Sequence, residues 1–323
     1  MSPLLNVENL VTWIASPKGV ISAVDDVSFS VDSGRTLALV GESGSGKSMT
    51  CLSVMGLLPE SGKIGAGRIE FKGENLLAKT PREMERIRGS QIGMILQDPM
   101  TALNPLFTIG DQVAEAFRRE KLSKAEIRDR VIDVLRKVRI PAPDKRLGAY
   151  PHQFSGGMRQ RVAIAINLAS SPRLLIADEP TTALDVTVQL QILELLRQIQ
   201  GDTGMGMILV THDLHLVSRF CDDVAIMYAG RIVEAGPVSK VFNAPEHPYT
   251  QGLLDAVPTL DQDAERLALI PGNPPTMHNL PGGCRFEPRC PVSLGQCASE
   301  YPEWYRLGQD RRVACWQMKQ RIA

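Results

Sequence analysis

Residues 41–48 carry the strongest chemical signal in the chain, because Gly-Glu-Ser-Gly-Ser-Gly-Lys-Ser fits the phosphate-binding pattern G-x-x-x-x-G-K-[S/T]. An apolar run at 36–40 precedes this loop, and a helix-like segment at 49–58 follows it. The glycines let successive backbone N–H groups turn toward phosphate oxygens, and the helix start adds the positive end of its dipole. Lys47 would reach the β- and γ-phosphates of a nucleotide, and the Ser48 hydroxyl would hold Mg²⁺. The alternative, a flexible Gly/Ser turn beside an incidental lysine, explains neither the full match nor its flanks.

An acidic pair, Asp178 and Glu179, follows an apolar strand predicted at residues 173–177. Asp178 at the end of such a strand can hold Mg²⁺, directly or through water, and Glu179 can polarise a water that attacks the γ-phosphate. Acidic pairs often simply end strands. The pair gains its meaning from the phosphate-binding loop upstream.

Three single side chains could complete this site, although each is weak evidence alone. His212 directly follows a predicted strand and could contact the γ-phosphate, or it could be an ordinary strand-end histidine. Gln97 also follows a predicted strand and could offer its amide to Mg²⁺ or water. Trp13, near the end of the first predicted strand, could stack on a nucleobase or be a partly buried aromatic without a ligand.

A second helix start suited to an anion lies at residues 154–161, Phe-Ser-Gly-Gly-Met-Arg-Gln-Arg. Ser155 is a natural N-cap, and Gly156 and Gly157 let backbone N–H groups approach a phosphate. The chain has one P-loop but two such helix starts. We therefore expect the second to serve a nucleotide bound by the partner chain of a dimer.

Four of the six cysteines gather near the C-terminus with the spacing C-x5-C-x6-C-x17-C. Four thiolates can close a tetrahedral Zn²⁺ site or hold a [4Fe–4S] cluster. The spacing lacks the paired C-x2-C of most zinc ribbons, and wider gaps suit a cubane whose irons face separate directions. Zinc and unligated thiols remain alternatives. The four residues are Cys284, Cys290, Cys297 and Cys315.

The elements that must position these residues are predicted to form an α/β core. Strands and helices alternate at the spacing of a parallel sheet wrapped by crossovers. Residues 108–138 show a helical period, which predicts a helical insertion, whereas residues 62–67 are predicted as a loop. Prolines become frequent after about Gly236, so an irregular extension is expected there.

Composition narrows the class of protein. The 323 residues suffice for one large core plus an appended domain, or for two domains. Basic and acidic side chains balance at 36 each, which argues against a broad cationic surface for nucleic acid. No apolar run reaches the about eighteen residues that span a bilayer, and the N-terminus lacks a signal-peptide plan. We expect a cytosolic chain, without structural disulfides, that meets a membrane only through a partner.

The chain resembles the ATPase subunit of an ABC transporter over roughly residues 4–240. The family's motifs follow in the usual order. The Walker A loop would be residues 41–48, the Q-loop glutamine Gln97 and the signature residues 154–158. Walker B would be Asp178-Glu179, the D-loop residues 182–185 and the switch histidine His212. One departure is Met158, where the family signature usually has Gln. The serine and both glycines that face phosphate are retained, so we expect this departure to adjust the activity of the signature and not to abolish it.

The resemblance implies an ATP hydrolase in which two subunits sandwich two ATP molecules head to tail. It implies an α/β P-loop NTPase core with an antiparallel β subdomain and a helical subdomain. Glu179 and His212 would be catalytic, Asp185 would belong to the D-loop, and Mg²⁺ would be held by Ser48, Gln97 and Asp178. The signature residues that face the partner chain's ATP would be Phe154, Ser155, Gly156, Gly157 and Met158. The chain's own ATP would be bound by Trp13 (the adenine-stacking position), Gly41, Glu42, Ser43, Gly44, Ser45, Gly46, Lys47, Ser48, Met49, Gln97 and Asp178.

Further motifs resemble the dipeptide/oligopeptide (and nickel) importer branch of this family. They are residues 98–105, Tyr-Pro-His-Gln at 150–153, His-Pro-Tyr-Thr at 247–250, and the tail segments 270–275 and 281–284. The resemblance implies an ATPase domain at 1–236, with a helical subdomain at about 98–168, and an extension at 237–323. It also implies an iron–sulfur cluster in some members.

The same branch implies a set of partners: a second, usually different ATPase subunit, two transmembrane permeases and an extracytoplasmic solute-binding protein. The chain would then work at the cytoplasmic face of the cell membrane. The alternative function is a soluble ABC ATPase acting on nucleic acid or ribosomes, but the second core, coiled coils or basic insertions of such proteins are not seen. A non-hydrolysing regulatory subunit is disfavoured by the retained Glu179 and His212.

Overall fold

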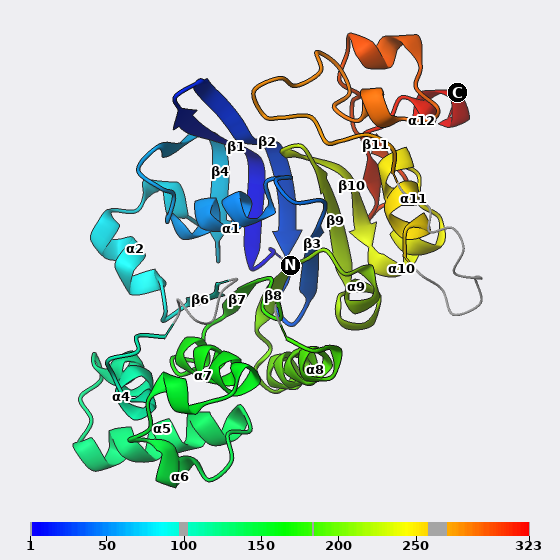
Figure 1. The fold of residues 1–323 in the computed structure, drawn as a ribbon. Coiled ribbons are helices and arrows are strands. Elements are labelled where there is room, and N and C mark those ends of the chain that lie inside the picture. The colour runs from blue at the N-terminus through cyan, green and yellow to red at the C-terminus, as the bar shows by residue number, and fades with distance from the viewer. Residues whose placement is uncertain (1, 97–102, 183, 258–269, 323) are drawn as a thin grey trace. The chain divides into compact units, whose positions relative to one another are not determined.

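The computed structural model describes residues 2–96, 103–182, 184–257 and 270–322. The chain divides into two compact units. Unit 1 holds residues 1–30, 36–77 and 211–323, and unit 2 holds residues 31–35 and 78–210. Figure 1 shows the fold of the chain, with its helices and strands labelled.

Unit 1 contains a sheet with the strand order β2-β1-β4-β5. β1 pairs antiparallel with β4, placing Leu5 opposite Phe71 and Ile14 opposite Gly62. Alternate residues of β1, such as Leu5 and Val7, are buried, as expected for a sheet with one face on a core. The strands are β1 (Leu5–Ser16), β2 (Gly19–Val31), β4 (Gly62–Phe71) and β5 (Glu74–Asn75).

The prediction of a loop at residues 62–67 is wrong, because these residues open β4. Their glycines suggested a turn, but they serve close approach to β1. A Cβ on Gly65 would lie 2.8 Å from the Trp13 ring, and one on Gly67, whose φ is +101°, would lie 2.7 Å from backbone oxygens of β1. Glycine is therefore required by the pairing and not by a turn.

A second set of strands in unit 1 has the order β11-β12-β10-β9-β3. β3 pairs parallel with β9, and β10 pairs antiparallel with both β9 and β12. Every residue of β3 is buried, which explains its unbroken apolar sequence. These strands are β3 (Thr36–Val40), β9 (Asp223–Tyr228), β10 (Arg231–Pro237), β11 (Tyr305–Arg306) and β12 (Arg312–Val313), and two helices of the unit are α1 (Lys47–Met55) and α9 (Leu214–Phe220).

The C-terminal extension, residues 237–323, lies within unit 1, and its described residues (237–257 and 270–322) form only short elements. Tyr228 of β9, Tyr249 and Phe286 are among the largest fully buried side chains and pack together, with ring centroids 4.6–5.4 Å apart. This aromatic contact joins the extension to the sheet. The elements are α10 (Val238–Asn243), α11 (Pro248–Asp255), the 3₁₀ helices η4 (Glu287–Arg289) and η5 (Gly295–Ala298), and α12 (Gln317–Ile322), with β11 and β12.

Unit 2 contains three parallel strands in the order β8-β7-β6 together with a group of helices. The predicted helical insertion is confirmed, since Ile109, Val113 and Phe117 are buried at helical spacing. The strands are β6 (Ile92–Ile95), β7 (Leu174–Asp178) and β8 (Gly206–Thr211). The helices are α2 (Pro81–Ile87), α4 (Ile109–Ala114), α5 (Lys124–Lys137), α6 (Pro143–Arg146), α7 (Gly156–Leu168) and α8 (Val186–Thr203), with the 3₁₀ helices η2 (Glu115–Phe117) and η3 (Pro151–Gln153). The 3₁₀ helix η1 (Leu76–Ala78) lies where the chain passes from unit 1 to unit 2.

Within the part of the chain that the structure describes, we find no helix with both the length and the apolar character needed to cross a lipid bilayer.

Candidate functional site

The P-loop in unit 1 connects β3 to α1, as the sequence predicts. Gly46 has a φ of +101°, and a Cβ there would lie 2.6 Å from the carbonyl oxygen of Ala23. A side chain is therefore excluded both by the left-handed backbone and by the neighbouring strand. The sequence motif and the packing therefore both require glycine at position 46.

Lys47, the first residue of α1, folds back over this loop. Its Nζ donates to the carbonyl oxygens of Gly41 at 2.7 Å and Glu42 at 2.9 Å, with Ser45 Oγ at 3.5 Å. The side chain is buried, whereas Ser48 beside it is exposed. A buried ammonium above a loop of backbone N–H groups at a helix start is suited to hold phosphate oxygens.

Two further predicted residues of unit 1 are exposed. Trp13 of β1 keeps 36% of its surface exposed, with Gly65 against its ring and Lys63 Nζ 5.4 Å from the ring centroid. It is therefore accessible for stacking on a base. His212 lies exposed between the end of β8 and the start of α9.

In unit 2, the acidic pair lies where the sequence predicts it. Asp178 ends β7 and is 5% exposed, and the next residue, Glu179, has a φ of +45°. Its N–H donates to the carbonyl oxygen of Val210 at 3.0 Å, and Thr182 Oγ1 donates to its carboxylate at 2.9 Å. A left-handed conformation is costly for a residue with a Cβ, so such strain often marks a functional constraint.

The second helix start, at α7, also has the predicted form. Ser155 is its N-cap, and its Oγ accepts the N–H of Met158 at 3.4 Å. A Cβ on Gly157 would lie 2.7 Å from a methyl group of Val188 in α8, so this glycine is required by packing. Asp185 caps α8 by accepting the N–H of Val188 at 2.9 Å.

The structure thus groups the predicted residues by unit. Unit 1 contains Trp13, the P-loop residues 41–49 and His212, and unit 2 contains residues 154–158, the acidic pair and Asp185. Gln97 lies outside the described residues.

The sequence reasoning missed the contacts that the C-terminal extension makes with the P-loop. The carboxylate of Glu42 forms a bidentate ion pair with Arg289, with N···O distances of 2.8 and 3.0 Å. The backbone N–H of Glu42 donates to Tyr249 Oη at 2.9 Å. Tyr249 belongs to a tetrapeptide that the sequence marks only as a branch motif, and Arg289 belongs to no recognised motif.

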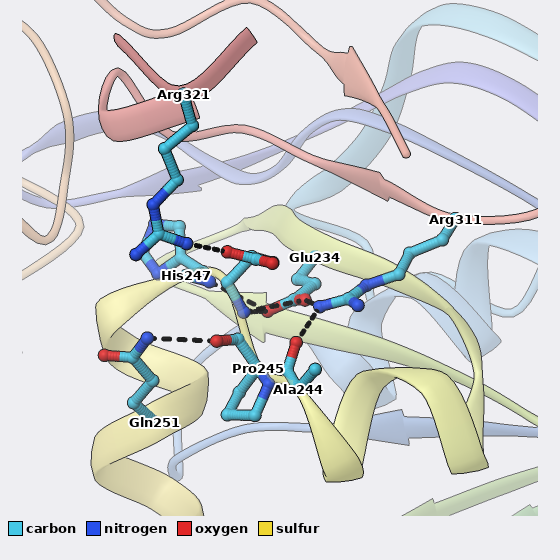
Figure 2. Close-up of polar contacts among 8 residues, drawn as sticks. Glu234, Ala244, Pro245, His247, Gln251, Arg311 and Arg321 are labelled. Atoms are coloured by element: carbon cyan, nitrogen blue, oxygen red, sulfur yellow. Dashed lines mark hydrogen bonds and ion pairs between the residues drawn. The ribbon is translucent and has the colours of Figure 1, made fainter. Parts of the chain in front are cut away.

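A buried ion pair attaches the same extension to β10 (Figure 2). Arg311 donates to the fully buried Glu234 at 2.6 Å and also to the carbonyl oxygen of Ala244. Glu234 further accepts the backbone N–H groups of Glu246 at 3.2 Å and His247 at 3.0 Å. This carboxylate therefore has charged and neutral partners, as a buried charge requires.

His247 begins α11, and its Nδ1 accepts the N–H of Tyr249 at 3.0 Å. Burial lowers the pKa of His247 to about 3, so the ring is neutral near pH 7. This cap fixes the start of the helix that carries Tyr249. The histidine and the tyrosine of the tetrapeptide thus support the P-loop together.

The four C-terminal cysteines lie in unit 1, and none is in a disulfide. Burial, with a contribution from neighbouring cysteine charges, raises the pKa of Cys284 to about 12 and that of Cys315 to about 11. Backbone N–H groups of Phe286, Val292, Leu294 and Gln317 hydrogen-bond the sulfur atoms of Cys284, Cys290, Cys297 and Cys315 respectively.

Their soft sulfur donors and the backbone N–H groups that they accept are chemical features of a soft-metal site. Among the residues that the structure describes, however, no group of three or more His, Cys, Asp or Glu side chains is arranged to hold a metal ion.

Comparison with known proteins identifies the class that this fold and these loops define. The family model "ABC transporter" matches residues 24–182, and "Oligopeptide/dipeptide transporter, C-terminal region" matches residues 233–297. The solved cassette in "Dimeric Structure of MJ0796, a Bacterial ABC Transporter Cassette" is 27% identical and has a TM-score of 0.65, covering 72% of this chain and 98% of that one. CbiO1 from Clostridium perfringens is 31% identical, with a TM-score of 0.66, covering 75% and 92%.

Relatives match over nearly the whole chain. The dipeptide transport ATP-binding protein DppD of Bacillus subtilis is 50% identical, covering 99% of this chain and 96% of its own. The oligopeptide transport ATP-binding protein OppD of Haemophilus influenzae is 49% identical, covering 98% of each. The chain belongs to the ABC-transporter ATPase family and carries the C-terminal region of its oligopeptide/dipeptide branch. It is an ATP hydrolase, the ATP-binding subunit of an ABC importer.

Proposed function

We propose that this subunit powers the uptake of dipeptides, oligopeptides or a related solute. The observation that carries the proposal is the joint presence of a complete ATPase motif set and a C-terminal region matched along residues 233–297. Relatives named for dipeptide and oligopeptide transport support the solute class. The alternative of an ATPase acting on nucleic acid or ribosomes is not favoured.

In this proposal, Lys47 and the P-loop N–H groups hold the phosphates of ATP, and Trp13 stacks on the adenine. The hydroxyl of Ser48 and the carboxylate of Asp178, with the Gln97 amide, are hard oxygen donors of the kind that Mg²⁺ takes. Mg²⁺ would neutralise charge on the phosphates. The donor chemistry supports this ligand set.

Glu179 acts as the general base that orients and deprotonates the attacking water, and His212 contacts the γ-phosphate. The hydrogen bond from Thr182 holds the Glu179 carboxylate in place. Its left-handed backbone supports this role, because strain of this kind persists where geometry is functionally constrained.

Residues 154–158 would contact the ATP bound by a second ATPase subunit, which we propose to be a different chain. The similar cassette MJ0796 was solved as a dimer, which supports a dimeric arrangement here. Two permeases and an extracytoplasmic binding protein would complete the importer at the cytoplasmic face of the membrane. We propose the domain boundary at residues 236/237, with a helical subdomain at about 98–168.

The variant Glu179→Gln tests the hydrolytic mechanism. We expect ATP binding to be retained and turnover to fall by about 10³-fold, because the amide cannot accept the proton of water. ATP hydrolysis and ATP-dependent uptake of a labelled dipeptide would be measured in proteoliposomes that contain the complete importer. Full activity of the variant would remove Glu179 from the base role, and hydrolysis without uptake of any peptide would remove the proposed solute class.

We also propose that Cys284, Cys290, Cys297 and Cys315 bind a [4Fe–4S] cluster. The gathering of the four cysteines within residues 284–315 and the backbone N–H donors to their sulfur atoms support this, since both features suit thiolates that share a cationic group. The test is visible absorbance with iron, acid-labile sulfide and zinc contents of the anaerobically purified chain. About four irons and four sulfides per chain are expected. One zinc, or no metal, would contradict the cluster and leave the ATPase proposal unaffected.

A further inference from the structure

We infer that Arg289 of the C-terminal extension is a positioning residue for ATP, acting on the P-loop through Glu42. The C-terminal extension would then contribute to the ATP affinity of the site. This inference rests on the proposed role of residues 41–48 in binding the phosphates.

The guanidinium of Arg289 is aimed at the P-loop by its own surroundings. Its Nε donates to the carbonyl oxygen of Pro271 at 2.9 Å, and one Nη contacts that of Ile270 at 3.3 Å. The other Nη donates to Tyr228 Oη at 3.2 Å. The side chain is only 5% exposed. These contacts hold the guanidinium of Arg289 in the orientation that pairs with the Glu42 carboxylate. The side chain therefore loses little conformational freedom when the ion pair forms.

Glu42 is held at each of its polar groups. Its carboxylate meets Arg289, and its N–H donates to Tyr249 Oη. Its carbonyl oxygen accepts the Lys47 ammonium at 2.9 Å and the Ser45 N–H at 3.2 Å. A movement of Glu42 would therefore move the acceptor that orients Lys47. Because phosphate binding needs Lys47 and the loop N–H groups in one arrangement, the ion pair preorganises the site.

The same short segment supports the P-loop from a second direction. Arg285 donates to the carbonyl oxygen of Ala229 and to the Asp25 carboxylate. Ala229 and Gly230 connect β9 to β10. The N–H of Gly230 donates to the carbonyl oxygen of Ser45 at 2.9 Å. Between the two arginines, Phe286 packs against Tyr228 and Tyr249. The segment thus contacts the P-loop directly at Glu42 and indirectly at Ser45, through Ala229 and Gly230.

A purely structural brace would act differently from a positioning residue. Losing a brace lowers thermal stability and the amount of folded protein, but the folded fraction binds ATP normally. Losing a positioning contact weakens ATP binding in protein that is folded. The Kd for ATP, and the split between KM and kcat, separate these two roles.

The test is the variant Arg289→Gln in the full chain, assayed for Mg²⁺-ATP binding by calorimetry and for hydrolysis in the importer complex. We expect the Kd and the KM for ATP to rise about tenfold, with kcat at saturating ATP within about twofold. Arg289→Lys should lie between wild type and this variant, because a lysine keeps the charge but loses the fork. The double variant with Glu42→Gln should be no worse than the poorer single variant, since both remove one interaction.

Arg311→Gln is the matched control. Arg311 is a second buried arginine of the extension, and it pairs with Glu234 instead of a P-loop residue. This change should lower the melting temperature without changing the Kd for ATP. If Arg289→Gln shows the same pattern, the positioning role is wrong and Arg289 is only a brace.

Should Arg289→Gln fail to fold, Glu42→Gln carries the test alone, because its side chain is 26% exposed and tolerates change better. An unchanged Kd in that variant overturns the inference. Failure of the underlying proposal looks different, because the wild-type chain would then not bind Mg²⁺-ATP, or Lys47→Ala would bind it normally.

Discussion

The two helix starts proposed to face phosphate both contain serine and glycine residues, but they are stabilised differently. The signature start in unit 2 is held by neighbours close in sequence: Ser155 caps the Met158 N–H, and Arg159 donates to the carbonyl oxygen of Phe154. The P-loop in unit 1 also has local contacts, from Lys47 and Ser45, but in addition it is held by residues 207 and 247 positions away, namely Tyr249 and Arg289. The hydrogen bonds named for the signature start are all local, whereas those of the P-loop also come from the C-terminal extension.

The largest expected effect comes from a local contact of the P-loop. Lys47→Ala removes the ammonium that bonds Gly41 and Glu42 and that is proposed to reach the phosphates. We expect ATP affinity to fall at least about 100-fold, because a buried charge-assisted contact is lost. Calorimetric titration with Mg²⁺-ATP would measure it, and tight binding by the variant would contradict the P-loop assignment.

A smaller effect is expected when the signature start is disturbed. Gly157→Ala places a Cβ against Val188, so α7 must shift, and hydrolysis in the assembled importer should fall about tenfold while the chain's own P-loop binds ATP as before. Because the clash is with a single side chain, Val188→Ala in the same chain should restore part of the activity. An absence of rescue would show that the glycine serves the ligand alone and not the packing.

The pH dependence of folding should reveal the capping histidine of the extension. The folded-state pKa of His247, about 3, lies below its ordinary value, so the neutral ring stabilises the fold above about pH 6.5. That contribution is lost as pH falls from about 6.5 toward 3, with a slope of up to about 1.4 kcal/mol per pH unit.

His247→Asn keeps an N-cap acceptor but does not titrate, so its stability curve should be flatter over this range. Urea unfolding at several pH values measures both curves. Parallel curves for the two proteins would contradict the assignment of this slope to His247.

The smallest expected effect tests most directly whether the P-loop depends on the extension. Tyr249→Phe keeps the aromatic packing but removes the acceptor for the Glu42 N–H. We expect the KM for ATP to rise about threefold to tenfold, since a neutral hydrogen bond contributes about 1 kcal/mol. Tyr228→Phe, which keeps the same packing, removes only an outer contact of Arg289 and should change the KM less. Equal effects would show that the hydroxyl of Tyr249 has no special role.

Much of the site could be predicted because its signals are short. The P-loop, the acidic pair after a buried strand, and the capped helix start at Ser155 each lie within a few consecutive residues, and steric and hydrogen-bonding rules act at that range. The loop predicted at 62–67 failed for the opposite reason. Its glycines serve a partner strand about 50 residues earlier, which no local rule detects.

The sequence by itself determined the ATPase motifs, the order of strands and helices, and a C-terminal region poor in long elements. Only the tertiary structure decided that this region reaches the P-loop through Tyr249 and Arg289. The physical reason is that a hydrogen bond or ion pair between distant residues depends on how the intervening chain folds. The identity of one residue does not indicate which distant residue it contacts.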